Sequence, residues 1–356
     1  MKTIDINTSN NYKVYVGDNN IISPGFLSEI FGELFKNNES PKCLVVTDDI
    51  VDKIHFELLK SSLDNLKINY SKIVLKNGEG SKNILEYKNI IDALAKSDLK
   101  KNDIVIAYGG GVIGDISGFA ASTWLRGIRY IQVPTTLLSM VDSSVGGKCA
   151  IDIEYGKNLV GSFWQPSAVV TNIDFLKTLP QNILSDGMSE VIKSAILKSS
   201  ELFEHLENNG FNFNAEYVVS ETVSIKNYFV SNDERENNIR QMLNLGHTIA
   251  HAIEKLSNYK IPHGTAVAVG LDKICALSTH YGILSNSSYE RIHKLLIKFN
   301  LPFETNFSID EMIDIIKIDK KTHGNKINII LPKEIGLCDI QTISLSELDT
   351  YFSPLK

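Results

Sequence analysis

The chain has 356 residues, of which 43% are hydrophobic and 22% charged. This is typical of a globular protein long enough for two domains that share a buried cleft. Its formal net charge of −6 argues against a nucleic-acid partner, because phosphate contacts need a surplus of lysine and arginine. The four cysteines lie far apart without a CxxC pair, so we expect neither a disulfide framework nor a cysteine zinc site, and a reducing compartment fits.

The beginning of the chain predicts neither export nor membrane insertion. Residues 1–18 alternate polar and β-branched side chains and have no apolar core of signal-peptide length. No stretch reaches the roughly 18 apolar residues that a membrane helix needs. We therefore expect a soluble, cytoplasmic protein with no membrane partner.

Short β-rich runs alternate with helical periodicity in the first half of the chain. The β-rich runs lie at 43–47, 72–75, 103–108, 130–133 and 168–172, and helical patterns include 56–66 and 84–99. Such alternation indicates βαβ crossovers. Residues 1–180 are therefore expected to form an α/β domain with a mostly parallel sheet.

Long helical stretches replace this alternation from about residue 180 onward. They lie at 187–198, 215–229 and 240–256, and the Asn-rich segment 208–214 between them is typical of a loop. Residues 181–356 are therefore expected to form an all-α domain.

A glycine-rich turn follows the β-rich run at 103–108. Residues 103–115 read DIVIAYGGGVIGD, a pattern that predicts a strand, a turn and then a helix. Glycines there let backbone N–H groups approach a phosphate at the positive end of the helix. Gly109, Gly111 and Gly114 satisfy GxGxxG, but no acidic residue follows about 20 positions later, so a Rossmann fingerprint is not predicted. By itself, the turn is explained equally well as a tight connection.

Two further segments carry anion-binding residue types. NGEGSK at 77–82 places an acid for hydroxyls and a lysine for phosphate just ahead of a helix. VPTT at 133–136, VDSSVGGK at 141–148 and GKN at 156–158 supply hydroxyl and backbone donors beside lysines. The spacing is not that of a P-loop, and the alternative is a flexible surface turn with solvated lysines.

The helical half contains ionisable residues at helical spacing. Glu190 and Lys193 are three residues apart and so share a helix face. Intervals of four, four, three and four predict one polar stripe on a single helix, formed by Glu236, Arg240, Asn244, His247 and His251. The alternative is a solvated face. Because the neighbouring residues are mostly apolar, we interpret the stripe as enclosed and in need of a metal and an anionic substrate as partners.

His263 stands at the start of another apolar helical segment. A lone histidine there is usually a capping or core residue. Together with Glu190 and His247, however, it completes a set of two histidines and one carboxylate, which leaves coordination positions open on Zn²⁺. A peptidase site is not expected, because Thr248 stands where HExxH needs its glutamate.

These residues resemble the 3-dehydroquinate synthase family of the shikimate pathway. The similarity covers about residues 77–321 and runs in the family's order through GGGVIGD, RG, PTTLL, VDSSVGGK, GKN, TLP, EVIK, DERE, LNLGHT, HAIE, HG and DKK. The resemblance implies an N-terminal α/β domain that binds NAD and a C-terminal helical domain that carries a divalent metal, zinc first and cobalt second. It also implies an active site between the two domains and a homodimer.

The implied reaction is that of a carbon–oxygen lyase acting on a small sugar-acid phosphate. It converts 3-deoxy-D-arabino-heptulosonate 7-phosphate into 3-dehydroquinate and phosphate. Transient oxidation by NAD, elimination of phosphate, re-reduction and an intramolecular aldol closure would follow one another, so NAD should cycle without net consumption.

The resemblance also assigns roles to residues. The metal ligands fall on Glu190, His247 and His263. NAD would be held by Asn77, Gly78, Glu79, Lys82, Gly110, Gly111, Val112, Ile113, Gly114, Asp115, Thr135, Thr136, Lys148, Lys157, Phe175, Leu176, Lys177 and Thr178. The substrate phosphate would meet Lys148, Asn158 and an Arg126 from the same or the neighbouring subunit. Its carboxylate and hydroxyls would meet Asp142, Lys157, Lys193, Lys226, Arg240, Asn244 and either Lys320 or Lys321. His251 would handle protons, and Glu236 is a further catalytic candidate.

Three alternatives remain at this stage. A metal-dependent polyol or alcohol dehydrogenase would share the two-domain layout but would have no use for the cationic residues. Another sugar-phosphate cyclase would act on a substrate without the carboxylate. A nucleotide-binding scaffold without activity would not need the complete ligand set.

Overall fold

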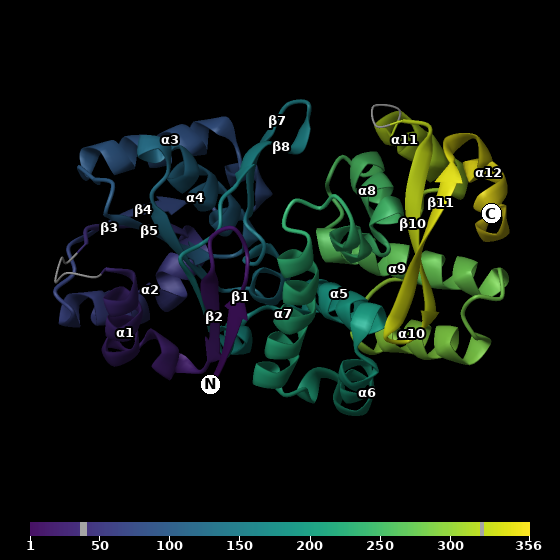
Figure 1. Ribbon diagram of the computed structural model, residues 1–356, viewed down its shortest axis with the longest axis horizontal. Helices are drawn as coiled ribbons and strands as arrows, with labels where there is room; N and C mark the ends of the chain where they lie inside the picture. Colours follow the sequence, from purple (N-terminus) through teal and green to yellow (C-terminus); the bar gives the residue numbers. More distant parts are fainter. Residues whose placement is uncertain (36–40, 321–323) are drawn as a thin grey trace. The chain divides into compact units, whose positions relative to one another are not determined.

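The computed structural model describes residues 1–35, 41–320 and 324–356 (Figure 1). The chain divides into two compact units. The first comprises Met1–Leu179 and Ala215–Arg235, and the second comprises Pro180–Asn214 and Glu236–Lys356. Among the helices of the described ranges, none combines the length and the apolar character needed to cross a membrane.

The first unit is built on a seven-stranded sheet with the order β1-β2-β9-β6-β5-β3-β4. Only β1 pairs antiparallel, with β2, and all other neighbours are parallel. The mostly parallel sheet expected from the sequence is confirmed, and each predicted β-rich run is a strand. The strands are β1 (Lys2–Ile6), β2 (Tyr12–Gly17), β3 (Cys43–Asp48), β4 (Tyr70–Leu75), β5 (Ile104–Gly109), β6 (Arg129–Pro134) and β9 (Ala168–Asn172).

Helices cover both faces of this sheet, and polar side chains start several of them. Asp48 caps α2 by accepting from the N–H groups of Ile50 and Val51, and Asn83 caps α3 in the same way. Alternate residues of β5 point to opposite faces. Val105 belongs to the cluster beneath α3 and α4, whereas the Tyr108 hydroxyl donates to the His55 carbonyl of α2. The helices are α1 (Pro24–Leu34), α2 (Asp49–Asn65), α3 (Ile84–Lys96) and α4 (Gly111–Thr123).

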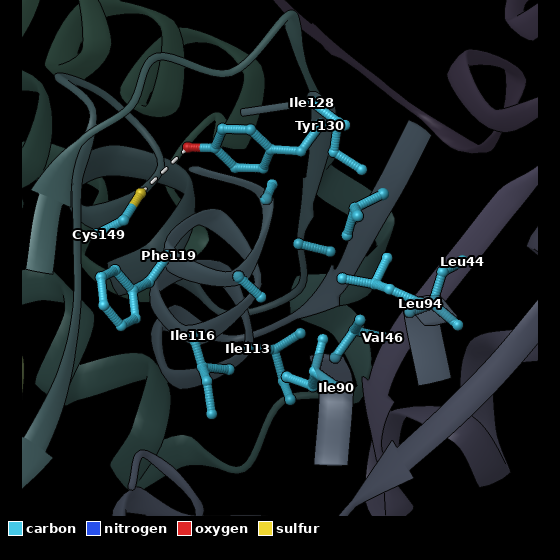
Figure 2. Close-up of a cluster of buried hydrophobic side chains, with 14 of the residues drawn as sticks. Leu44, Val46, Ile90, Leu94, Ile113, Ile116, Phe119, Ile128, Tyr130 and Cys149 are labelled. Carbon is cyan, nitrogen blue, oxygen red and sulfur yellow. Dashed lines mark hydrogen bonds between the residues drawn. The ribbon is translucent and has the colours of Figure 1, made fainter. Parts of the chain in front are cut away.

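Figure 2 shows the buried cluster that holds α3 and α4 to the sheet. Leu44 and Val46 of β3 meet Ile90 and Leu94 of α3, all of them fully buried. At about 25 cal/mol per Å² of apolar surface, side chains of this kind supply most of the folding free energy. The cluster therefore fixes where α4 begins, and with it the glycine turn before α4.

A separate antiparallel ribbon, β7 (Lys148–Ile153) and β8 (Gly156–Phe163), projects from this unit. Most of β8 is exposed, so it lacks the apolar alternation that identifies a strand. The sequence therefore gave no prediction of this ribbon, although it carries three of the candidate residues, Lys148, Lys157 and Asn158.

Helix α7 (Ala215–Asn232) differs from the expected division at residue 180, because it belongs to the first unit. It packs against β1, β2 and the π-helical turn Ser139–Ser143. Asn227 Nδ2 donates to the Asp5 carbonyl at 2.9 Å. Lys226 on this helix is therefore part of the α/β unit.

The second unit is helical, as expected, apart from one antiparallel hairpin formed by β10 (Lys326–Glu334) and β11 (Leu337–Ser344). The all-α expectation was wrong for this hairpin. Ile327, Ile329 and Leu331 of β10 face the core and are buried. Their alternation covers only a short segment near the end of the chain, so it did not lead to a strand prediction. The helices are α5 (Gln181–Lys198), α6 (Ser200–Asn209), α8 (His247–Leu256), α9 (His263–His280), α10 (Asn286–Lys298), α11 (Ile309–Lys320) and α12 (Leu348–Tyr351).

The single helix expected at 240–256 is broken at Gly246, which corrects the prediction of one continuous polar stripe. Residues Ile239–Asn244 form a 3₁₀ helix, and α8 begins at His247. Gly246 has φ +78°, and a Cβ there would lie 2.9 Å from the Leu271 nitrogen of α9. The left-handed turn allows α8 and α9 to approach closely, and only glycine fits it without strain.

Candidate functional site

Three ligand-type side chains of the second unit converge on one point. Glu190 lies within α5, whereas His247 and His263 are the first residues of α8 and α9. Glu190 Oε1 lies 3.6 Å from Nε2 of His247 and 3.6 Å from Nε2 of His263. One ligand atom from each residue lies within 4.8 Å of the others. The structure thus brings together the set selected from the sequence.

The start of α9 is tied to α5 by close backbone contact. A Cβ on Gly264 would lie 1.9 Å from the Asp186 carbonyl oxygen, so only glycine permits this approach. The Asp186 carboxylate accepts from the Thr265 N–H at 2.7 Å, which satisfies a donor in the first turn of α9. Sequence reasoning missed Asp186, because its partner is distant in the chain.

Both imidazoles have an acceptor at Nδ1. The Nδ1 of His247 lies 3.1 Å from the Leu245 carbonyl oxygen, and the Nδ1 of His263 lies 3.3 Å from Glu254 Oε1. Acceptors at these positions favour a proton on Nδ1, which leaves Nε2, the nitrogen facing Glu190, as the atom that can bind a metal. This is the arrangement that a metal-binding imidazole requires.

Burial and charge act together on the protonation of these groups. Burial alone raises the pKa of Glu190, but Lys193 and the two histidines hold it well below its usual value. Burial, followed by the charge of Lys193, lowers the pKa of His247 well below the usual range. Burial also works to lower the pKa of His263, yet the nearby carboxylates of Glu190 and Glu254 raise it to about 10.

The two carboxylate oxygens of Glu190 differ in their contacts. Its Oε2 forms an ion pair with Lys193, and both side chains are almost completely buried. Its Oε1 is buried and, among the described residues, has no hydrogen-bond partner. A buried oxygen that lacks a donor is costly, and a cation between the carboxylate and the two Nε2 atoms would satisfy it.

Of the other residues of the predicted stripe, His251 lies beside this cluster despite the break at Gly246. His251 follows His247 by one turn of α8, with ring centroids 5.4 Å apart, and is exposed. Asn244 Nδ2 donates to Glu236 Oε1 at 2.8 Å. Arg240 is buried. Glu254 is a further residue of this group. Sequence reasoning missed it, because nothing about its position on the helix distinguishes it from any other glutamate.

In the first unit, the candidate cofactor residues gather at the carboxyl ends of β5 and β6. Gly110 precedes α4 and has no side chain to cap it. A Cβ on Gly111 would lie 3.0 Å from Ser143 Oγ, and one on Gly114 would lie 2.5 Å from Gln132 Oε1. These glycines keep the start of α4 against β6 and the π-helical turn, where anions commonly bind in α/β sheets.

Several hydroxyl groups beside this turn are buried without an internal partner. Among the described residues, the hydroxyls of Thr135, Ser143 and Ser144 make no hydrogen bond. Thr136, by contrast, exchanges hydrogen bonds with Ser139. Unsatisfied buried donors beside a helix N-terminus suit an anionic ligand.

Lys82 joins three of the predicted segments. Its Nζ lies 2.5 Å from Asp115 Oδ2 and 2.6 Å from Asn158 Oδ1. Lys157 Nζ lies 3.6 Å from Glu79. Burial works to lower the pKa of Lys82, but Asp115 and Glu79 raise it, whereas burial raises the pKa of Asp115 against the influence of Lys82.

The remaining cofactor candidates lie on two connecting segments. Asn77 donates its N–H to Asp49 Oδ1 at 2.9 Å, and Gly78 has φ +105°. Phe175 and Thr178 belong to the 3₁₀ helix Ile173–Thr178, together with Leu176 and Lys177. Thr178 Oγ1 lies 2.8 Å from His55 Nε2, and the His55 ring packs on Phe175 at 4.5 Å. His55 had no sequence signal, since it is a lone histidine on α2.

The substrate candidates of the first unit include residues in three places. Lys226 Nζ lies 2.7 Å from Asp142 Oδ1 and also donates to its carbonyl oxygen. Lys148 is exposed at the start of β7. Arg126 is exposed, with φ +61°, between Leu125 and Gly127, which also have positive φ. Such backbone strain in non-glycine residues is typical of functional segments. The side chains of Lys320 and Lys321 lie outside the described part of the chain.

Both halves of the chain match one family. The family model for the 3-dehydroquinate synthase N-terminal region matches residues 72–186, and that for the C-terminal region matches residues 187–322. The 3-dehydroquinate synthase of Clostridium acetobutylicum is 41% identical over 358 residues, covering 99% of each chain. That of Prochlorococcus marinus strain MIT 9312 is 41% identical over 331 residues, covering 90% of this chain and 91% of the relative.

Solved structures share the fold at lower identity. The 2-epi-5-epi-valiolone synthase of Streptomyces hygroscopicus, with NAD⁺ and Zn²⁺ bound, has a TM-score of 0.86 at 24% identity, with 97% of this chain and 96% of that chain covered. A 2-deoxy-scyllo-inosose synthase complexed with carbaglucose-6-phosphate, NAD⁺ and Co²⁺ has a TM-score of 0.84 at 22% identity, with 99% of each covered. The identity over nearly the whole length of curated relatives decides the assignment: this chain belongs to the 3-dehydroquinate synthase family, carbon–oxygen lyases of the shikimate pathway.

Proposed function

We propose that the chain converts 3-deoxy-D-arabino-heptulosonate 7-phosphate into 3-dehydroquinate and phosphate, with NAD and a divalent metal as cofactors. The observation that carries this proposal is the convergence of Glu190, His247 and His263 in a member of the 3-dehydroquinate synthase family. Within the reaction, bound NAD⁺ supplies a reversible hydride acceptor and the metal polarises substrate hydroxyls.

The metal proposal is supported by the fit of the donor set. The two Nε2 atoms lie 3.6 Å from the unsatisfied Oε1 of Glu190. Nitrogen and carboxylate donors in this number suit Zn²⁺ with open positions, and Co²⁺ accepts the same donors. These three residues would hold the ion.

The NAD proposal is supported by the glycine turn and the unsatisfied hydroxyls of Thr135, Ser143 and Ser144. The N–H groups of the first turn of α4 and these hydroxyls would bind the cofactor's phosphates. Glu79 would accept from ribose hydroxyls, and the segment Ile173–Thr178 would line the same site. Titration with NAD⁺ by calorimetry tests this assignment directly.

The charged residues would hold the substrate by its two anionic ends. Lys148, Asn158 and Arg126 would meet the phosphate, with Arg126 drawn from the same or the neighbouring subunit of a homodimer. The carboxylate and hydroxyls would meet Asp142, Lys157, Lys193, Lys226, Arg240, Asn244 and either Lys320 or Lys321. Holding both ends selects one reactive conformer, which is a large part of the rate enhancement that an enzyme can supply.

Proton handling would fall to His251. It is exposed beside His247 and lies on the same helix face as the metal ligand. Glu236 and Asn244 form a hydrogen-bonded pair that would position the group accepting or returning the proton.

The four cysteines are unpaired and buried, which supports a reducing, cytoplasmic setting for the reaction.

The decisive experiment measures phosphate release and absorbance at the NADH wavelength together, with a catalytic trace of NAD⁺. We expect many turnovers per NAD⁺ and no lasting NADH. NADH accumulating one-for-one with product would instead indicate a dehydrogenase. Phosphate release from substrates without the carboxylate, but not from the heptulosonate, would indicate another sugar-phosphate cyclase.

A further inference from the structure

The two metal-site histidines differ in what lies behind them. The Nδ1 of His247 faces the Leu245 carbonyl, a neutral acceptor, at 3.1 Å. The Nδ1 of His263 faces the carboxylate of Glu254 at 3.3 Å. A carboxylate fixes the imidazole orientation as a carbonyl does, but it also makes the opposite nitrogen a stronger electron donor.

Glu254 is placed for this contact by the same helix that supplies His247. The two residues lie seven apart on α8, which is close to two full turns, so they share one face of the helix. The side chain of Glu254 is only 8% exposed. A carboxylate at that depth needs a partner that can carry positive charge, and His263 provides it.

We infer that Glu254 is the positioning residue that orients His263 and strengthens its bond to the metal. The inference rests on the metal site proposed above and assigns Glu254 no contact with the ion. The ligand atoms that lie within 4.8 Å of one another belong to Glu190, His247 and His263. Glu254 therefore acts through His263.

The charge of Glu254 also compensates for that of Lys193. Lys193 is paired with the ligand carboxylate of Glu190, so the pair alone is neutral. A divalent cation would therefore gain little electrostatic attraction from this pair. Glu254 adds one negative charge next to His263, on the side of the ring opposite the nitrogen that would bind the ion. This charge attracts the cation.

The test compares Glu254→Ala with Glu254→Gln in the full-length protein. The glutamine keeps the volume and an acceptor oxygen but loses the charge. Zinc affinity is measured by competition with a chromophoric chelator, and the coordination geometry by the visible spectrum of the Co²⁺-loaded protein. Lys255→Ala, at an exposed position on the same helix, is the control, and urea unfolding of the metal-free proteins reports their folding.

We expect Glu254→Ala to weaken zinc binding by about 10- to 100-fold and to change the Co²⁺ spectrum. Glu254→Gln should lose about tenfold or less, since its amide oxygen still accepts from Nδ1. Lys255→Ala should match the wild type. Wild-type zinc affinity and spectrum in both folded Glu254 variants, while His263→Ala loses zinc, would overturn the inference and leave the metal site standing. Equal zinc binding by the wild type and His263→Ala would overturn the metal site itself.

Discussion

Lys193 forms an ion pair with Glu190 one turn away on α5, with side-chain exposures of 3% and 2%. The contact neutralises a carboxylate that would otherwise be buried at high cost. Lys193 engages Oε2, whereas Oε1 is directed at the two histidines. The ion pair thus keeps Glu190 ionised and leaves it free to bind a metal.

Replacing Lys193 with Met should destabilise the metal-free protein. Removing one partner of a buried ion pair costs roughly 3–5 kcal/mol, and the adjacent His263 should limit the loss to about the lower end of this range. With zinc bound, the ion neutralises Glu190, so the loss should be smaller. Urea unfolding with and without zinc measures both values. An equal loss in the two states would contradict this role for Lys193.

The metal ligands should be separable from the proton-handling residue. Alanine at Glu190, His247 or His263 should lower bound metal and activity together. His251→Ala should keep the metal, while turnover falls by about 100- to 10,000-fold, the usual loss for a general acid–base group. Metal content is measured by atomic absorption on each purified variant. Loss of metal in His251→Ala with retention in His263→Ala would show that the two roles are exchanged.

Zinc binding should release a proton from His263. Its pKa is raised to about 10, so in the metal-free protein the ring is protonated at neutral pH. A metal binds only the unprotonated nitrogen, so apparent affinity should rise by about tenfold per pH unit up to about pH 10. Calorimetry in buffers of different ionisation enthalpy counts the released protons. A count of zero at pH 7 would contradict the assigned protonation.

The parallel sheet and the metal ligands were predictable because their signals are local. Strands buried on both faces, such as β3, β5 and β9, read as continuous apolar runs. Glu190, His247 and His263 are residue types with few other uses in apolar helices. The spacing of Arg240 and Asn244 to His247 could be recognised in the sequence. The break in the helix between them could not, because the neighbours of Gly246 do not show that its backbone is left-handed.

Residues that act through distant partners were not predictable. Glu254 and Asp186 make their contacts only when α8 and α5 meet the start of α9. Strand β8, which is mostly exposed, has no apolar period to reveal it, and α7 returns to the first unit through contacts more than 200 residues apart in sequence, such as Asn227 with Asp5. Pattern reasoning finds which residues are unusual, whereas tertiary packing decides which of them meet.

Gly246→Ala should destabilise the second unit more than Gly282→Ala does. Both glycines have positive φ, at +78° and +69°, so each alanine costs about 1–2 kcal/mol of backbone strain. Only at Gly246 would the new Cβ meet a neighbour, the Leu271 nitrogen at 2.9 Å, whereas nothing lies within 4 Å at Gly282. Urea unfolding measures the difference, and zinc affinity should fall only in Gly246→Ala, since His247 is the next residue. Equal losses would mean that α8 and α9 can separate without cost.

The two ends of the substrate should be read by different residues. Arg240 is buried within the second unit, and Lys148 is exposed at the start of β7 in the first. A charge-assisted hydrogen bond to an anion is worth roughly 1.5–3 kcal/mol, or about 10- to 150-fold in binding. Arg240→Met should therefore weaken the carboxylated substrate by at least that factor while sparing an analogue without the carboxylate. Lys148→Met should weaken the binding of every phosphorylated ligand and spare a dephosphorylated analogue.

Inhibition constants for the two analogues measure these effects, with NAD⁺ affinity as the control. Equal losses for both analogues in both variants would mean that these residues do not distinguish the ends of the substrate, even if the activity itself were present.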